Sequence, residues 1–279
     1  MNKVQKTGSR LPLFIFSVTV ALACVLRFFQ LLKYTDAKNG YSLNGEMSIA
    51  LYCLFALVAV FSGIYSKNIK ISNKIFEFDN GNRAYFLSSA FLCLTFFIDF
   101  VHQCYNCYYY VSKTAYIEHT YITILALSAF LSVLCCFYFG VFSLTALGRN
   151  YDFRSFKYFH FAPVMWGFSK LILIMLKIVD IRFNVEACIE FLLVCFMLMF
   201  FLCFVSSIDR KGKASRLLVF SSLMTIMLSL VISVPRLLLV ITHSWEKLYN
   251  AGFTVTTYVA VGAIAFTVLN KAIRYNSGE

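Results

Sequence analysis

The stretch LLVFSSLMTIMLSLVISVPRLLLVIT, residues 217–242, decides the fold class of this chain, because it is apolar throughout except for hydroxyl side chains and Arg236. As an α-helix, an apolar run of about 20 residues crosses a hydrocarbon layer about 30 Å thick. Comparable runs recur along the whole chain, so spans are predicted at residues 11–32, 47–65, 84–105, 120–147, 159–176, 187–205, 217–242 and 251–269. The sequence therefore predicts an all-α integral membrane protein, a single membrane domain of eight transmembrane helices.

The composition and the distribution of charge support a membrane environment. Of the 279 residues, 60% are hydrophobic and 14% are charged, whereas about 25% of the residues in soluble domains are charged. The net charge of +12 does not indicate nucleic acid, because sixteen lysines and arginines fall in alternate loops and termini and six in the others. Short loops rich in lysine and arginine stay in the cytoplasm during insertion. We therefore expect both termini in the cytoplasm and the lipid bilayer as the main partner.

The predicted spans form four helical hairpins, and polar residues suggest a tandem hairpin repeat. Arg27 and Glu46 flank the first outer loop, Asp99 and Glu118 flank the second, and the two pairs are displaced by 72 positions. Because every hairpin starts on the same side, a duplication would give parallel rather than inverted repeats. Hairpins of similar length also produce such matches without duplication.

Arg27, Asp99, Lys170 and Arg236 are charged residues that lie well inside the predicted spans. A charged side chain at the centre of a bilayer costs at least about 2.5 to 3.5 kcal/mol on insertion scales. The four side chains should therefore face the interior of the bundle and turn toward one another. Polar residues at helical spacing support this interpretation; they are Ser88, Thr95, His102 and Asn106 around Asp99, and Ser222, Thr225, Ser229 and Ser233 before Arg236.

Two interpretations of this polar centre stay open. In the first, Arg27, Lys170 and Arg236 outnumber the acid Asp99 and line a cavity that holds a carboxylate or a phosphate. His102 would then be the proton-linked partner of Asp99. In the second, Asp99 pairs with one or two of the cations, lysine and arginine reach toward the interface, and the polar stripes hold the helices together.

Four acids, Glu46, Glu118, Glu186 and Glu190, stand where even-numbered spans begin on the outer side. Helix N-termini favour negative charge, so these residues are expected to stabilise the helix ends. The alternative is a ring of acids that admits cations to an outer mouth. Glu190, one turn deeper than Glu186, is the best candidate for that role.

His102, Cys104 and Cys107 form an H-x-C-x-x-C motif at the outer end of the third span. Imidazole and thiolate groups bind zinc or copper, but on a continuous helix the two cysteines share a face that His102 does not. The helix would have to end before the three side chains converge on a metal. A Cys104–Cys107 disulfide and ordinary interface residues are the alternatives. The surrounding tyrosines are typical of an aromatic belt at the membrane surface or of a binding platform; they are Tyr105, Tyr108, Tyr109 and Tyr110.

The sequence contains no H-E-x-x-H, G-x-S-x-G or Walker motif, which disfavours enzyme activity but leaves it open, and no cofactor is predicted. Two classes of function remain. The first is a transporter or binder of a small anionic solute or lipid head group. The second is a sensor or accessory subunit that recognises a membrane protein partner through its helices and its basic loops.

The segment LRFFQLL at residues 26–32, followed by Tyr34, Asp36 and NGY at residues 39–41, resembles a recurrent segment of uncharacterised multi-spanning membrane proteins of Gram-positive anaerobic bacteria. The likeness spans residues 26–41. It implies a location in the plasma membrane of a bacterium, and it carries no activity with it.

Overall fold

The computed structural model of the chain describes residues 10–34, 45–69, 75–76, 82–113, 119–148, 157–180, 185–209, 215–242 and 255–274. Within these ranges the regular secondary structure is entirely helical. The elements are α2 (Arg10–Tyr34), α3 (Gly45–Asn68), α4 (Arg83–Lys113), α5 (His119–Ala146), the short 3₁₀ helix η2 (Lys157–Phe161), α6 (Ala162–Asp180), α7 (Val185–Asp209), α8 (Arg216–Ile241) and α9 (Val255–Arg274).

Eight helices in the described ranges are long and apolar enough to cross a membrane. This confirms the prediction of eight helical spans, each of which overlaps one of these helices. The largest difference at a boundary is in α4, which continues past the predicted end at residue 105 to Lys113. Large apolar side chains cover the outside of the bundle; Phe14, Leu87 and Phe137, for example, are 66%, 65% and 68% exposed. Lipid is the solvent that such a surface requires.

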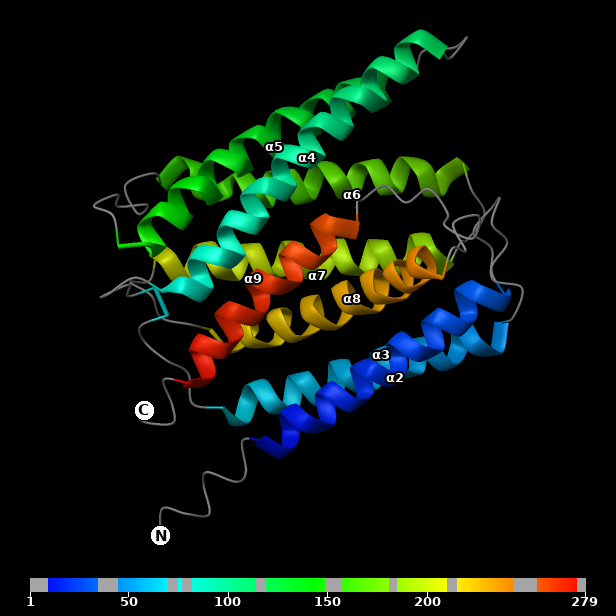
Figure 1. Cartoon of the computed structure of the whole chain (residues 1–279), viewed down its shortest axis with the longest axis vertical. Helices are drawn as coiled ribbons and strands as arrows, with labels where there is room; N and C mark the ends of the chain where they lie inside the picture. The colour runs from blue at the N-terminus through cyan, green and yellow to red at the C-terminus, as the bar shows by residue number, and fades with distance from the viewer. Residues whose placement is uncertain are drawn as a thin grey trace.

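Helix α8 is the central element of the bundle (Figure 1). It packs against α2, α3, α7 and α9, and 78% of its most apolar segment is buried, compared with 28% for α2. On one side of α8 lies the pair α2 and α3, and α4 packs against α5 on the other side of the molecule. Helix α9 contacts both α4 and α8. It therefore connects the two sides of the bundle.

The first residues of α2 and the last residues of α9 lie at the same end of the bundle, on the left in Figure 1. We term the opposite end, where α2, α4, α6 and α8 finish, the distal end. There the end of α4 and the start of α5 stand away from the other helices (Figure 1). Three tyrosines of this part of α4 are more than half exposed, namely Tyr105, Tyr108 and Tyr109. Their assignment to an aromatic belt or a binding platform stays a prediction.

The hydroxyl groups of α8 form a packing surface. The side chains of Ser222, Ser229 and Ser233 are at most 1% exposed, and each donates a hydrogen bond to a backbone carbonyl of its own helix. Gly262 of α9 lies directly against Ser229, where any Cβ would collide with the serine Oγ. Small residues of this kind let two helix backbones approach closely inside a membrane. The interpretation of this stripe as helix-packing contacts therefore accounts for these serines.

Candidate functional site

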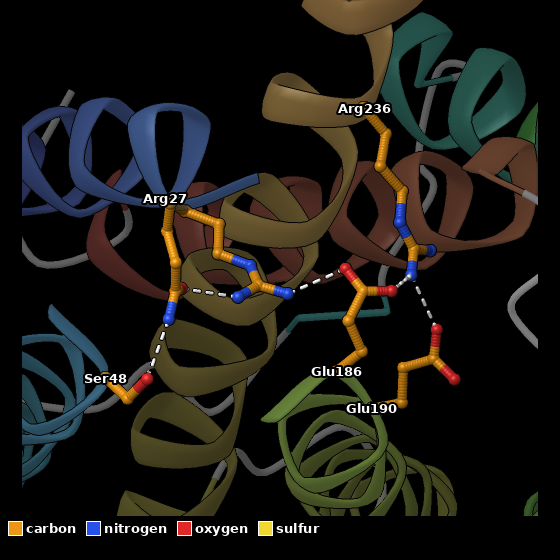
Figure 2. A network of polar contacts seen from close by, with 6 residues as sticks. Arg27, Ser48, Glu186, Glu190 and Arg236 are labelled. Carbon is orange, nitrogen blue, oxygen red and sulfur yellow. Dashed lines mark hydrogen bonds and ion pairs between the residues drawn. The ribbon is translucent and has the colours of Figure 1, made fainter. Parts of the chain in front are cut away.

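Two arginines and two glutamates form a cluster near the distal end of the bundle (Figure 2). Arg27 of α2 donates from Nη2 to Glu186 Oε1 at 2.7 Å. Arg236 of α8 donates from Nη2 to the other oxygen of the same carboxylate, Glu186 Oε2, at 2.9 Å, and to Glu190 Oε1 at 2.8 Å. All four side chains are at least 92% buried. The Glu186 carboxylate thus bridges cations from two helices that are far apart in sequence.

Neutral side chains extend this cluster to two more helices. Arg27 donates a second hydrogen bond, from Nη1 to Gln30 Oε1, and Gln30 Nε2 donates to Ser48 Oγ of α3 at 2.8 Å. On the other side, the guanidinium carbon of Arg236 lies 5.7 Å from the ring centroid of Tyr258 in α9. We term the residues of Figure 2 the distal cluster: Arg27, Gln30, Ser48, Glu186, Glu190 and Arg236.

The distal cluster lies close to the ends of its helices. Glu186 is the second residue of α7, which begins at Val185. Arg236 precedes the last residue of α8 by five positions, which corresponds to about 8 Å along a helix. Arg27 precedes the end of α2 by seven positions, or about 10 Å. A charge near the end of a spanning helix generally costs less than one at the bilayer centre, because its side chain can reach the interface.

A second cluster surrounds the carboxylate of Asp99, deeper in the bundle. Asp99 Oδ1 accepts from Lys170 Nζ at 2.8 Å and from Gln103 Nε2 at 3.3 Å. Asp99 Oδ2 accepts from Ser132 Oγ at 2.7 Å and from Trp166 Nε1 at 3.0 Å. Four donors from α4, α5 and α6 therefore satisfy both oxygens, which is the condition under which a carboxylate is tolerated away from water.

We term these five residues the central cluster: Asp99, Gln103, Ser132, Trp166 and Lys170. Asp99 and Lys170 are 0% and 1% exposed. The Lys170 ammonium lies 5.5 Å from the ring centroid of Trp166, one turn earlier on α6, and this ring packs edge-on against Phe96 of α4. Asp99 follows the start of α4 by sixteen residues and precedes its end by fourteen, so the charge pair lies near the middle of the longest helix.

The structure divides the four intramembrane charges between two places. We expected Arg27, Asp99, Lys170 and Arg236 to turn toward one another. Instead, Lys170 pairs with Asp99, whereas Arg27 and Arg236 share Glu186. The expectation that three cations outnumber a single acid is also wrong, because it counted Glu186 and Glu190 only as residues of the helix ends. With these two acids, three cations face three carboxylates.

The predicted ring of outer acids is not a uniform set. Glu186 and Glu190 are 4% and 6% exposed and belong to the distal cluster, whereas Glu46 is exposed at the start of α3. Glu118 lies outside the described residues. Glu186 and Glu190 are four residues apart, and this spacing places both carboxylates on one face of α7. That spacing is a sequence signal that the two carboxylates share their surroundings, although it does not identify the arginines as their partners.

The H-x-C-x-x-C motif lies on a continuous helix, because α4 runs without a break to Lys113. The helix end that metal binding would require is thus absent from residues 102–107. Cys104 and Cys107 are free thiols, and the described residues contain no group of three or more histidine, cysteine and acidic side chains that would hold a metal ion. His102 Nδ1 lies 3.2 Å from Asn106 Nδ2, one turn later. The α4 side chain that donates to Asp99 is Gln103.

An apolar groove of about 630 Å³ lies between α2, α8 and α9. It extends from Leu13 to Phe28 along α2 and from Leu223 to Leu238 along α8. Fifteen residues of helix correspond to about 22 Å, or most of the hydrocarbon thickness of a bilayer. Its lining is almost entirely hydrocarbon, so a lipid chain is compatible with it and a small polar solute is not.

The apolar bundle and its buried ion pairs define the class of this molecule as a multi-pass membrane protein. Comparisons of the chain with protein-family models, with curated proteins and with solved structures give no match. Its function is therefore inferred from the two clusters and the surfaces around them.

Proposed function

We propose that the chain binds a small anionic group, a carboxylate or a phosphate, at Arg27 and Arg236. Without the ligand, the Glu186 carboxylate fills the anion position between the two arginines, and the ligand displaces it. The observation that carries the proposal is the bridging carboxylate of Glu186, which receives one arginine on each oxygen. A ligand carboxylate or phosphate presents the same pair of oxygens to the same two guanidinium groups.

Three further features support this site. The two arginines come from α2 and α8, so a ligand between them would join helices that are distant in sequence. Arg236 keeps a second carboxylate, Glu190, at 2.8 Å when Glu186 moves away. The cluster also lies within about 10 Å of the helix ends, a short path for a polar ligand from the aqueous side.

The central cluster has a different role in this proposal. Lys170 forms an ion pair with Asp99, and three neutral donors complete the shell of that carboxylate. We therefore assign Lys170 and Asp99 to the stability of the bundle rather than to the ligand. Conservative changes at the central cluster should leave ligand affinity unchanged in protein that still folds.

The anion has two chemically equivalent sources, a solute in water or the head group of a lipid. The apolar groove beside α2 and α8 favours a lipid, because a hydrocarbon chain would fill it. Inorganic phosphate and phosphatidylglycerol are suitable probes for the two sources. Phosphatidylcholine serves as the control for binding of lipid chains without a net negative head group.

The test measures the thermal stabilisation of purified protein in detergent by each probe. Glu186→Gln removes the charge of the carboxylate that the ligand displaces, so the anion-dependent shift in melting temperature should be larger than in the wild type. Arg27→Gln and Arg236→Gln should each abolish the shift in protein that remains monodisperse. Glu46→Gln, an exposed acid at the same end of the bundle, is the matched control and should behave as the wild type.

The outcome of this experiment separates the alternatives. A shift with phosphatidylglycerol alone assigns the site to lipid, and a shift with phosphate as well assigns it to solutes. Equal shifts in the wild type, Glu186→Gln and both arginine variants would refute anion binding at this cluster.

A sensor or accessory subunit in a membrane complex is the second candidate function. The distal part of α4 favours it, because three of its tyrosines are exposed where the helix stands away from the bundle. Tyrosine is enriched in protein interfaces. Replacement of Tyr105, Tyr108 and Tyr109 by serine should then release a co-purifying membrane protein without altering the anion-dependent melting shift.

We further propose that the chain lies in the plasma membrane of a bacterium with both termini in the cytoplasm, so that the distal cluster opens toward the outside. The excess of lysine and arginine in alternate loops supports this orientation. A reporter that is active only in the cytoplasm should be active when fused to either end. Activity at one end alone would contradict the orientation.

A further inference from the structure

Two cysteines of the α4–α5 pair touch one another. The Sγ atoms of Cys93 and Cys136 are 3.5 Å apart, and the Cys93 thiol donates to the backbone carbonyl of Cys136 at 3.2 Å. Gly140, one turn further along α5, has no side chain, and a Cβ placed there would lie 3.6 Å from Cys93 Sγ. The Cys93 thiol therefore sits directly against the backbone of α5.

The surroundings of these thiols place them at the border between the core and the lipid. Both cysteines are half-buried, and the next residues on their helices, Leu94 and Phe137, are 56% and 68% exposed. Cys135, beside Cys136 in sequence, is 0% exposed. Adjacent residues of a helix diverge by about 100°, so Cys135 points inward, whereas Cys136 faces Cys93 and remains accessible from the bilayer.

We propose that Cys93 and Cys136 form a redox-active dithiol that a lipid-soluble quinone oxidises to a disulfide. A disulfide requires the two Sγ atoms to approach to about 2.05 Å, which is about 1.5 Å closer than their present contact. Rotation of two side chains on helices that already pack closely provides a movement of this size.

The reaction balances with a quinone as the oxidant. The two S–H bonds break and one S–S bond forms, so the cysteines lose two electrons and two protons. The quinone accepts both electrons and both protons and becomes a hydroquinone. Thiol reductants reverse the reaction by exchange through a mixed disulfide. A quinone dissolves in the hydrocarbon layer, where the exposed edges of Cys93 and Cys136 are accessible.

The disulfide would also act on the central cluster. Cys93 precedes Asp99 by six residues on α4, and Cys136 follows Ser132 by four residues on α5. The hydrogen bond from Ser132 to Asp99 spans the same two helices at 2.7 Å. A covalent link one to two turns away would fix the relative position of α4 and α5 at this contact.

The test treats the purified full-length protein, in detergent, with decyl-benzoquinone. Free thiols are then alkylated under denaturing conditions, and the protein is analysed by mass spectrometry. We expect the wild type to lose two alkylation sites, to give a Cys93–Cys136 linked peptide, and to produce one hydroquinone per chain. Dithiothreitol should restore both alkylation sites.

Three single variants serve as controls. Cys93→Ser and Cys136→Ser should each retain every remaining thiol after quinone treatment, whereas Cys135→Ser should form the cross-link as the wild type does. Retention of all thiols in the wild type overturns the proposal, even if a copper–phenanthroline oxidant forms the link, because the quinone is then not the oxidant. A quinone adduct on either cysteine, or a cross-link that persists in Cys93→Ser, overturns it as well.

Discussion

The distal and central clusters hold buried charge in two different ways. In the distal cluster, two arginines and two glutamates neutralise one another, and one carboxylate is shared between α2 and α8. In the central cluster, one lysine meets one aspartate, and neutral donors from α4, α5 and α6 complete the carboxylate shell. The distal cluster lies within about 10 Å of the ends of α2 and α8, whereas Asp99 and Lys170 lie near the middle of α4 and α6. A carboxylate remote from water requires donors on its oxygens, and we infer that this difference in depth is the cause.

The two clusters also divide the helices into two groups. The distal cluster links α2, α3, α7 and α8, and the central cluster links α4, α5 and α6. Helix α9 lies between them, with the ring of Tyr258 near Arg236 and a hydrogen bond between Thr267 Oγ1 and Ser88 Oγ of α4 at 3.2 Å. A ligand that separates Arg27 from Glu186 would therefore act first on the group that contains α8.

Loss of one charge from the central pair should give the largest change in stability. Asp99→Asn removes the carboxylate that forms the ion pair with Lys170. Removing one partner of a buried ion pair typically costs about 3–5 kcal/mol, because the other charge stays buried without compensation. We expect a loss of this order in the free energy of unfolding, measured by reversible denaturation in mixed micelles.

Two controls decide whether depth is the cause. The double variant Asp99→Asn/Lys170→Met carries no uncompensated charge and should recover more than half of the loss. Glu186→Gln should cost less than Asp99→Asn, because Arg236 retains Glu190 and the cluster lies near the helix ends. If Glu186→Gln costs as much as Asp99→Asn, depth does not distinguish the clusters.

The next effect, smaller than the loss for Asp99→Asn, is energetic coupling between substitutions. Two substitutions within one cluster should be coupled more strongly than two substitutions in different clusters. Arg27→Gln and Arg236→Gln both release Glu186, so their effects should deviate from additivity by about 0.5–3 kcal/mol in a double-mutant cycle. Arg27→Gln and Ser132→Ala act on different clusters and should add to within about 0.5 kcal/mol. The same denaturation measurement gives both values. Equal coupling in the two cycles would mean that the clusters form one network.

The spans, the buried charges and the packing stripe followed from the sequence because each depends on local properties. Hydropathy over a window of residues reports the solvent of a helix, and the period of about 3.6 residues reports which side chains share a face. Lys170 and Asp99 were therefore recognisable as buried, and the serines of α8 as one stripe. Their partners were not recognisable, because pairing depends on which helices are neighbours.

Glu186 shows how this limit operates. A glutamate in the first turn of a helix has a sufficient local explanation in the helix dipole, and nothing in the sequence near it refers to Arg27 or Arg236. Gln103 and Ser132 were missed for a related reason, since a neutral polar residue inside a predicted span does not have to pair with a charge. The Cys93–Cys136 contact joins two helices across a hairpin and is likewise invisible to local patterns.

The smallest predicted difference compares one serine of each cluster. Ser132 donates to the charged carboxylate of Asp99 at 2.7 Å, whereas Ser48 accepts from the neutral amide of Gln30 at 2.8 Å. Side-chain hydrogen bonds inside membranes average about 0.6 kcal/mol and reach about 1.7 kcal/mol. Because a bond to an ionised acceptor is stronger than one between neutral groups, we expect about 1–1.5 kcal/mol for Ser132→Ala and about 0.5 kcal/mol for Ser48→Ala.

Ser143→Ala provides the reference for both variants, because Ser143 Oγ donates to the Gly140 carbonyl of its own helix and joins neither cluster. Its loss should be the smallest of the three in the denaturation measurement. If Ser48→Ala costs as much as Ser132→Ala, the charge of the acceptor adds nothing at this depth. The carboxylate of Asp99 would then be stabilised by Lys170 alone. The neutral donors around it would result from helix packing and would not be the condition that allows a charge at the centre of the bundle.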